Sequence, residues 1–555
     1  MNTTKPPPDD PGGPGKGGQE GAQKRLMGAT ILMMLGVLLS RVLGLVRDSV
    51  IAHKFGQGYA TDIYNAAFTI PDVIFYLIAG GALSSAFIPV FTEYMERGEK
   101  REAWRLFSIV CVATTVVVGI FIVAGELLVY PLVKVFNPGW AGQRISDTVA
   151  LTRILLPAQI CFFLGGLMMG ALQVLRNNMG QVLGPAVYNL GIILGGVFLT
   201  QRFGVAGLCW GAVGGAVLGN LLLQWVLLRR SGGRFSTSVF SNFHHKGASQ
   251  VWNLMWPILL GLALPQVCPI VNKLFASFLD NGAMSALMNS NRLMQVPLGV
   301  FGQACGLAIF PLIAQQAARG ERAALRSTIS AGIRFVLFLT VPSSVFIIVL
   351  ALPIVQFLYQ SGKFTSSDAH LTATILVAYT VGLFAWSAQA IVARGFYALK
   401  NSRTPVIIGT LVTVLFVIAN ATVLHFVGTG SRHSAAGAYG LAMVTSCAAI
   451  LNTGILFALL RRRLGGIDGL QLAIATLKIL VASAAFGVAC RLTLAFLERH
   501  PLPVRLATVK LVSAENLLVC AIAGILVYAA MAFLLKMDEA KMLVSLVKRG
   551  KKPGD

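Results

Sequence analysis

The chain has 555 residues, of which 56% are apolar and only 12% are charged, and its mean hydropathy is +0.74. Soluble domains carry about 25% charged residues, so this composition excludes a water-soluble fold and indicates an integral membrane protein. The net charge of +24 does not indicate a nucleic-acid partner, because the basic residues are scattered over short loops. It fits the excess of Lys and Arg on the cytoplasmic side of membrane proteins.

The chain begins with a segment rich in proline and glycine. Residues 1–25 contain no apolar stretch. This composition predicts a disordered tail and neither a packed domain nor a cleaved signal peptide.

The rest of the chain is a series of long apolar segments. A transmembrane helix needs about 20 mainly apolar residues, and about fourteen segments reach that length, which predicts an all-α membrane protein. The expected spans are residues 27–53, 63–92, 104–133, 149–174, 182–201, 205–229, 252–278, 284–316, 329–358, 371–398, 405–427, 435–460, 470–495 and 515–536.

Lysine and arginine are concentrated in alternate loops. Positive charge of this kind marks the cytoplasmic side, and an even number of spans then places both termini in the cytoplasm. The basic groups lie within residues 97–105, 229–246, 319–326, 400–403 and 461–463.

An internal repeat organises the spans. Residues 89–100 (PVFTEYMERGEK) match residues 311–322 (PLIAQQAARGER), and Pro131 and Pro353 follow them at equal spacing. Each repeat holds six spans, so we expect two six-helix lobes in parallel orientation, related by an axis near the membrane normal, as in transporters. Two helix ends that merely look alike are the simpler alternative.

The repeat divides the chain into parts with different roles. The final helix pair stands outside the repeat. The expected parts are a cytoplasmic tail (1–25), an N-lobe (26–231), a cytoplasmic linker (232–249), a C-lobe (250–463), the final pair (464–537) and a basic cytoplasmic tail (538–555).

The first span contains charged residues inside an apolar helix, namely Arg41, Arg47 and Asp48. Each charge costs about 2.5–3.5 kcal/mol at the bilayer centre. A water-filled cavity between the lobes would remove most of that cost, which makes these residues candidate ligands of a substrate, together with the neighbouring Ser40. Snorkelling to an interface and a structural ion pair are the alternatives.

A second group of candidates lies on the seventh and eighth spans. Arg292, preceded by Asn291, is the repeat counterpart of the start of the second span, where Asp62 lies. Asn272 and Lys273 stand near the end of the seventh span. If these residues are functional, they lie at the cavity. The alternatives are that Arg292 anchors the helix at the membrane interface, and that Asn272 and Lys273 cap the helix or snorkel to the interface.

Proline and glycine interrupt the second and eighth spans at matching places. Pro71 and residues 79–82 interrupt the second span, and Pro297 and Gly299 interrupt the eighth. Matching breaks in two repeats point to a moving, central site. Ordinary packing kinks are the alternative.

No enzymatic motif accompanies these features. The sequence has no Walker A loop, no Gly-x-Ser-x-Gly elbow and no metal-spaced Cys or His cluster, so we expect no catalysis, no cofactor and no metal. Arginine in a cavity suits a phosphate or pyrophosphate, which it grips by paired, charge-assisted hydrogen bonds. A cationic drug would need acidic groups instead, and a non-transporting scaffold would not need buried charge or paired helix breaks.

Several motifs resemble those of the MurJ (MviN) family of lipid II flippases, which belongs to the multidrug/oligosaccharidyl-lipid/polysaccharide exporter superfamily. The resemblance runs from about residue 26 to about residue 540. The motifs are SRVLGLVRD (40–48), ATD (60–62), GALSSAFIP (81–89), FASFL (275–279), NRLM (291–294), GKFT (362–365) and RGFY (394–397).

The resemblance implies both the cargo and the site. The cargo would be lipid II, undecaprenyl-pyrophosphate with a disaccharide-pentapeptide, moved from the inner to the outer leaflet of the bacterial cytoplasmic membrane by alternating access. The final helix pair would form a lipid-tail groove. Arg41, Arg47, Asp48 and Arg292 would line the cavity. We expect a monomer whose other partners are membrane lipids, and the resemblance is compatible with an association with the cell-wall synthesis machinery.

The sequence also departs from the family pattern. Many members carry an Arg-Arg pair and an acid after the second-helix proline, where this chain has Phe75, Tyr76 and Gly80. Acids beside the eighth-helix arginine are replaced by Asn291 and Gln295. We therefore expect a less charged cavity and leave open whether an ion pair gates the lobes. The eleventh span contains no acid, so no sodium site is expected.

Overall fold

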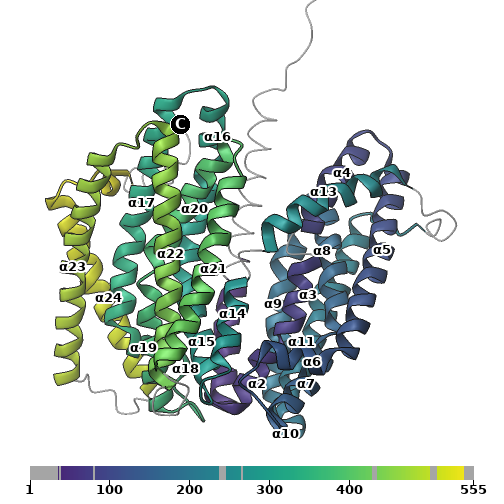
Figure 1. The fold of residues 1–555 in the computed structure, drawn as a ribbon, viewed down its shortest axis with the longest axis horizontal. Coiled ribbons are helices and arrows are strands. Elements are labelled where there is room, and N and C mark those ends of the chain that lie inside the picture. Colours follow the sequence, from purple (N-terminus) through teal and green to yellow (C-terminus); the bar gives the residue numbers. More distant parts are fainter. Residues whose placement is uncertain are drawn as a thin grey trace, which may run out of the picture.

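The computed structural model of this protein describes residue 36 and residues 39–78, 82–236, 245–263, 267–427, 434–500 and 509–542. Within these ranges all regular structure is helical. Two helical bundles stand side by side, joined at one end and spread apart at the other (Figure 1). The expected tail at residues 1–25 lies outside the described residues.

The N-lobe starts with a helix over residues 39–55, called the first helix below. Its further elements are α2 (Tyr59–Ala67), α3 (Thr69–Ile78), α4 (Ala82–Glu96), α5 (Lys100–Leu127), α6 (Val129–Phe136), α7 (Gln143–Leu155), α8 (Ala158–Val174), α9 (Met179–Leu194), η1 (Gly195–Leu199), α10 (Thr200–Phe203), α11 (Ala206–Gly215), η2 (Ala216–Leu222) and α12 (Leu223–Arg230). The η elements are π-helical turns that continue their neighbours, so α9–α10 and α11–α12 each form one long rod.

The second half of the chain repeats this arrangement and adds a helix pair. Its elements are α13 (Lys246–Ala263), α14 (Val267–Ala276), α15 (Ala283–Pro297), η5 (Leu298–Gln303), α16 (Ala304–Ala318), α17 (Arg322–Val349), α18 (Ala351–Tyr359), α19 (Ser366–Thr380), α20 (Leu383–Ala398), α21 (Arg403–Val427), α22 (Ser434–Leu464), α23 (Gly469–Arg499) and α24 (Val509–Leu534). The pair α23–α24 packs against α17 and α18 on the flank of the C-lobe (Figure 1).

The described residues of each of the fourteen expected spans form one helix or consecutive helices. Eleven helical rods of the described chain are long and apolar enough to cross a membrane. The other three expected spans, 27–53, 63–92 and 252–278, include residues outside the described ranges. The fold is therefore the all-helical membrane architecture that the hydropathy pattern predicts.

Helix α13 departs from the simple division into lobes. It begins at Lys246, within the segment expected as the linker, and it packs against α3, α4 and α5 of the N-lobe. Its neighbour α14 packs mainly against α21 and α22 and also contacts α15 and, on the N-lobe, α6. The seventh span therefore starts on one lobe and ends on the other, and below the C-lobe means α14–α22.

The interruptions of the second and eighth spans differ in form. Pro71 falls in the first turn of α3, where the missing N–H costs no helical hydrogen bond. Residues 79–81 lie outside the described ranges. Pro297 is followed directly by the π-helical turn η5, which widens the helix without breaking it. Such turns are frequent at functional sites.

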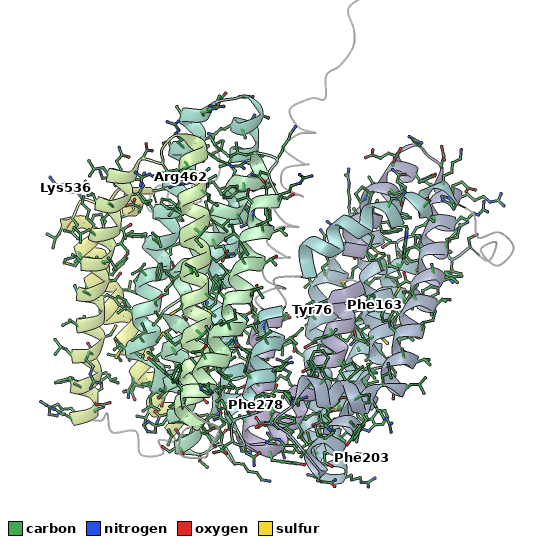
Figure 2. The ribbon with its side chains drawn as sticks, in the orientation of Figure 1. Tyr76, Phe163, Phe203, Phe278, Arg462 and Lys536 are labelled. Carbon is green, nitrogen blue, oxygen red and sulfur yellow. The ribbon has the colours of Figure 1, made fainter. Side chains whose placement is uncertain are left out.

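The joined and spread ends differ in their loops. Arg462 marks the spread end of the C-lobe, whereas Phe278 and Phe203 lie at the joined end (Figure 2). The basic loop before α5 also lies at the spread end (Figure 1). A buried apolar cluster of the N-lobe continues into α15, α18 and α19 and reaches α20, α21 and α22, so the described parts of the two lobes share a buried core.

Candidate functional site

Three of the charged residues predicted from the sequence meet where the lobes face each other. Asp48 is 5% exposed. Its Oδ1 atom lies 2.8 Å from Nη2 of Arg47 and 2.9 Å from Nη1 of Arg292. One buried carboxylate is thus shared by two guanidinium groups, one from each lobe, and the cluster keeps a net positive charge.

Two asparagines hold these arginines in place. Nη1 of Arg47 donates to Oδ1 of Asn189 at 3.0 Å, and the amide of Asn189 donates to the carbonyl oxygen of Ser40 at 3.3 Å. On the other side, Nη2 of Arg292 reaches Oδ1 of Asn65 at 3.4 Å. Ser40 therefore contributes its backbone to the site. Sequence reasoning missed Asn65 and Asn189, because a polar residue in a span gives no sign of its partner.

The cluster borders a cavity of about 170 Å³ between the lobes. Lys273 also reaches it and lies 3.5 Å from Asp72 of the N-lobe. Three cations and one carboxylate thus line a space that suits a phosphate group. The lining residues are Arg47, Ile51, Tyr64, Asn65, Phe68, Asp72, Tyr188, Ile192, Lys273, Met288 and Arg292.

Arg41 lies apart from this cluster. Its side chain is exposed, and it makes no hydrogen bond or ion pair with another residue that the structure describes. The guanidinium group rests against Gly299, because a Cβ atom placed at Gly299 would overlap it. Arg41 therefore reaches the π-helical turn of the eighth span, on the other lobe, with its donors still available.

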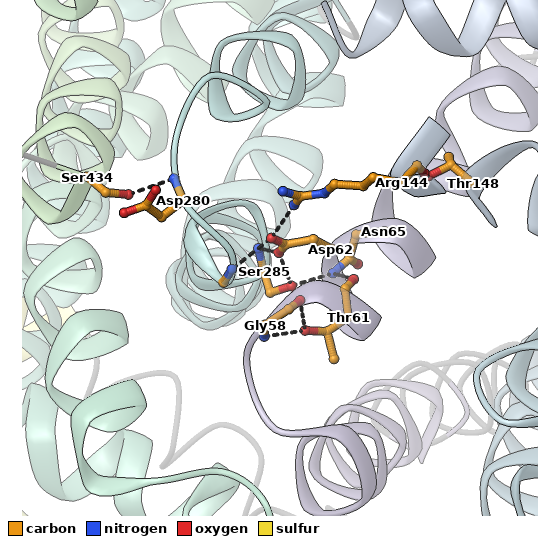
Figure 3. A network of polar contacts seen from close by, with 10 residues as sticks. Gly58, Thr61, Asp62, Asn65, Arg144, Thr148, Asp280, Ser285 and Ser434 are labelled. Atoms are coloured by element: carbon orange, nitrogen blue, oxygen red, sulfur yellow. Dashed lines mark hydrogen bonds and ion pairs between the residues drawn. The ribbon is translucent and has the colours of Figure 1, made fainter. Parts of the chain in front are cut away.

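Asp62 fastens the lobes together instead of lining the cavity. Its buried carboxylate accepts hydrogen bonds from the backbone of Gly282 (2.7 Å) and Ser285 (2.9 Å), from the Ser285 hydroxyl (2.6 Å) and from Arg144 (2.9 Å), as Figure 3 shows. Gly282 and Ser285 flank the start of α15, where backbone N–H groups have no helical partner. A carboxylate of the N-lobe thus caps a helix of the C-lobe.

Further contacts close the joined end. The Thr372 hydroxyl donates to Oε1 of Gln57 at 2.6 Å, and the backbone N–H of Gly139 donates to the Ser277 hydroxyl at 3.1 Å. Both pairs join one lobe to the other. Together with Asp62 they seal the joined end, whereas the lobes separate toward the basic loops.

Asn272 and Asn291 face a different space. They line a pocket of about 360 Å³ that lies within the C-lobe. The amide of Asn272 donates to Tyr379 at 3.3 Å and to Thr445 at 3.0 Å. The structure therefore separates these two candidates from the arginine cluster.

A third, apolar cavity of about 800 Å³ runs beside the site. It starts at Leu45 of the first helix, between Arg41 and Asp48, and extends along the eighth span and α17 to α24. Ser343 and Tyr528 are its polar lining residues. The others are Leu45, Leu293, Val296, Pro297, Val300, Phe301, Phe338, Leu339, Pro342, Phe346, Ile347, Ile354, Leu358, Leu376, Phe486, Ala521, Ile525, Ala529, Ala532, Phe533 and Ala540.

The described residues contain no group of three or more His, Cys, Asp or Glu side chains that could hold a metal ion.

Arg144 is a further residue that the sequence did not single out. It binds Asp62 and stacks 3.8 Å over the Trp140 ring. Trp140 lies in the loop before α7, so no helical spacing signals this cation–π contact in the sequence.

Comparison with known proteins identifies relatives over most of the chain. The family described as "Lipid II flippase MurJ" matches residues 51–510. The "Probable lipid II flippase MurJ" of Vibrio cholerae serotype O1 is 30% identical over 451 residues, which cover 78% of this chain and 82% of the relative. The "Lipid II flippase MurJ" of Burkholderia cenocepacia is 28% identical over 441 residues, covering 77% and 82%.

Solved structures show the same fold. "Lipid II flippase MurJ, inward closed conformation" superposes with a TM-score of 0.72 at 24% identity, covering 92% of this chain and 99% of that one. An inward-facing MATE family transporter of the MOP superfamily gives a TM-score of 0.63 at 13% identity, with 79% and 99% coverage.

Proposed function

Because this chain belongs to the MurJ family of lipid II flippases, we propose that the cluster of Arg47, Asp48 and Arg292 binds the pyrophosphate of lipid II during transport. The protein is a membrane transporter of peptidoglycan synthesis and not an enzyme. The observation that carries the proposal is the single buried carboxylate shared by two arginines from different lobes.

This arrangement can exchange its own carboxylate for the cargo. A pyrophosphate offers more acceptor oxygens and more charge than Asp48, and arginine binds such groups by paired hydrogen bonds. Cargo that engages Arg47 and Arg292 competes with the pair between Asp48 and Arg292. That pair joins the two lobes. Cargo binding therefore weakens the contact between the lobes and shifts the equilibrium between the conformations of the transporter.

Arg41 and Lys273 extend the positive surface. Arg41 has donors available beside Gly299, and Lys273 lines the same cavity as Arg292. We therefore propose that both residues attract the pyrophosphate into the cavity and bind it there. Asp62 receives a different role, because its carboxylate is already saturated with donors from the opposite lobe.

The apolar cavity supports a place for the lipid tail. Undecaprenyl is a long hydrocarbon, and the cavity between the first helix, α17 and α24 is lined almost entirely by apolar side chains. Such a lining keeps the tail in apolar surroundings comparable to those of the bilayer core. The cavity starts beside Asp48, which allows a tail in the groove to place its pyrophosphate at the cluster.

We infer that the conformation described here is open toward the cytoplasm. Its spread end carries the basic loops, and positive charge favours the cytoplasmic side. This orientation also supports cytoplasmic termini in a bacterial inner-membrane protein. Alternating access then requires the joined end to open, which breaks the bonds between Asp62 and α15.

The site is tested by lipid II translocation in vesicles, together with rescue of a flippase-depleted strain. We expect the double variant R47A/R292A to lose transport, and R153A to keep it, because Arg153 is a surface residue paired with Glu126. Full transport by R47A/R292A would overturn the site. Drug extrusion without lipid II transport would favour a drug exporter of the same superfamily.

A further inference from the structure

Helices α14 and α15 carry neighbouring residues that face two different spaces. Asn272 precedes Lys273 on α14, and Asn291 precedes Arg292 on α15. Lys273 and Arg292 line the charged cavity between the lobes, whereas both asparagines line the pocket within the C-lobe. Adjacent residues on a helix point about 100° apart. The cations and the carboxamides thus occupy adjacent faces of the two helices, and a small space lined by residues of both cavities, Lys273 and Asn291 among them, lies between the two.

The pocket within the C-lobe is polar but uncharged. It measures about 360 Å³, which lies within the range of roughly 300–1,000 Å³ for ligand pockets. None of its lining residues is charged. Helices α14 and α21 lie on the side of the C-lobe that faces the N-lobe (Figure 1). The polar side chains of the lining are Asn272, Asn291, Gln295, Gln389, Asn452 and the threonine and tyrosine hydroxyls.

Two residues that line this pocket each have a buried carboxamide oxygen without a described donor. Both donated bonds of Asn272, to Tyr379 and Thr445, come from its amide nitrogen, and its buried Oδ1 accepts nothing from the described residues. Asn272 itself is only 6% exposed. Oδ1 of Asn452 is likewise buried without a described donor. Unsatisfied buried acceptors cost free energy, and a ligand that donates hydrogen bonds removes that cost.

We propose that this pocket binds the sugar part of lipid II through Asn272 and Asn452. The inference rests on the proposed function, because the sugar is the group covalently next to the pyrophosphate. A pyrophosphate at Arg292 brings the sugar to Asn291, one residue away. Sugar hydroxyl and acetamido N–H groups donate to the free carboxamide oxygens, and Trp386 offers an aromatic face. Lining aromatics with a few placed polar groups are typical of ligand pockets.

The chemistry of the lining favours the sugar over other occupants. The peptide part of lipid II carries carboxylates, which would meet no cation here. A metal cation would meet no carboxylate among the lining residues. A neutral ligand that offers hydrogen-bond donors is the class that this lining satisfies.

The test measures binding of three probes to the purified full-length protein. The probes are undecaprenyl-pyrophosphate, the same lipid with the disaccharide but no peptide, and lipid II. We expect Asn452→Leu and Asn272→Leu each to weaken binding of both sugar-bearing probes by about 3- to 10-fold, the value of one lost hydrogen bond. Binding of undecaprenyl-pyrophosphate should stay unchanged.

Asn420→Leu is the matched control. Asn420 is fully buried on α21 with both side-chain polar atoms unpartnered among the described residues, but it does not line the pocket. It should leave the affinity for all three probes unchanged. A folding defect in Asn272→Leu would show as a lower melting temperature. Because Asn452 is only partly buried, the binding measured with Asn452→Leu would then test the proposal.

The outcomes separate this proposal from the proposed function. Equal losses for all three probes, no loss, or a loss restricted to the peptide-bearing probe would overturn the sugar pocket. A wild-type affinity that depends on sodium, with that dependence lost in Asn452→Leu, would also overturn it in favour of a cation site. Unchanged binding of undecaprenyl-pyrophosphate to Arg292→Ala would instead contradict the pyrophosphate site.

Discussion

Arg292 of the C-lobe and Asp48 of the N-lobe form a hydrogen-bonded ion pair of 2.9 Å across the interface. Asp48 is also bound to Arg47 on its own helix. Loss of Asp48 therefore leaves two cations without a carboxylate, whereas loss of one arginine leaves Asp48 paired. This asymmetry makes Asp48 the residue whose replacement should separate binding from transport.

Replacement of Asp48 by asparagine should strengthen cargo binding and slow transport. The variant removes the carboxylate that competes with pyrophosphate, so the affinity for undecaprenyl-pyrophosphate should rise by about 10-fold, which is about 1.4 kcal/mol. Transport should fall because the variant lacks the ion pair between Asp48 and Arg292 that cargo binding would otherwise break. Binding and vesicle translocation measure the two effects. Weaker binding would show that Asp48 mainly positions the arginines.

Replacement of Asp62 by asparagine should loosen the joined end. The carboxylate accepts four hydrogen bonds, and an amide nitrogen in its place would face donors. Buried hydrogen bonds to a charged group are worth about 1.5–3 kcal/mol each. Cross-linking of a Gln57→Cys/Thr372→Cys pair, whose native side chains touch, should become slower in the Asp62→Asn background.

The control for Asp62 is Asp147→Asn. Asp147 bonds to Tyr59 and Gln143, all within the N-lobe. Cross-linking between the lobes should keep its wild-type rate in this variant. An equal slowing in both variants would mean that the effect arises from the fold of the N-lobe and not from the contact between lobes.

A methyl group at Gly139 should also open the joined end. A Cβ atom there would overlap the backbone oxygen of Ser277 on the opposite lobe, and a backbone atom cannot rotate away. Gly139→Ala should therefore lower the yield of the same cross-link about 10-fold, the effect of about 1.4 kcal/mol. Gly119→Ala adds its methyl group to open space and should leave the yield unchanged. An unaltered yield in Gly139→Ala would contradict the close approach.

The apolar cavity can be filled from α24. Ala529 is exposed and lines it, whereas the neighbouring Ala530 is exposed but does not. Ala529→Trp should lower the affinity for undecaprenyl-pyrophosphate by about 10-fold, which is about 1.4 kcal/mol, because the indole ring fills space that the tail would occupy. Ala530→Trp should behave as wild type. If both variants bind alike, the tail lies elsewhere.

The charges of the site were predictable, because they are costly in a membrane. Arg47, Asp48 and Arg292 stand out in apolar segments, and the structure brings them together. The sequence left open whether an ion pair joins the lobes, since the family positions hold Phe75 and Tyr76. The structure has such pairs through other acids, Asp48 and Asp72.

Other features depend on tertiary contacts that no local pattern encodes. Asn65 and Asn189 are ordinary polar residues until their partners are known. The capping of α15 by Asp62 joins residues that are more than two hundred positions apart. Hydropathy fixes the length of the seventh span but not the lobe that each half joins, so the place of α13 on the N-lobe could not be foreseen.

The ion pairs between the lobes also have a fixed polarity. Among the described residues, Asp48 and Asp72 on the N-lobe supply the acids, and Arg292 and Lys273 on the C-lobe supply the bases. The two lobes therefore present complementary charges to each other at this interface. A pair of N-lobes would set acid against acid, and like charges repel. The charges at this interface therefore favour the pairing of an N-lobe with a C-lobe over the pairing of two like lobes.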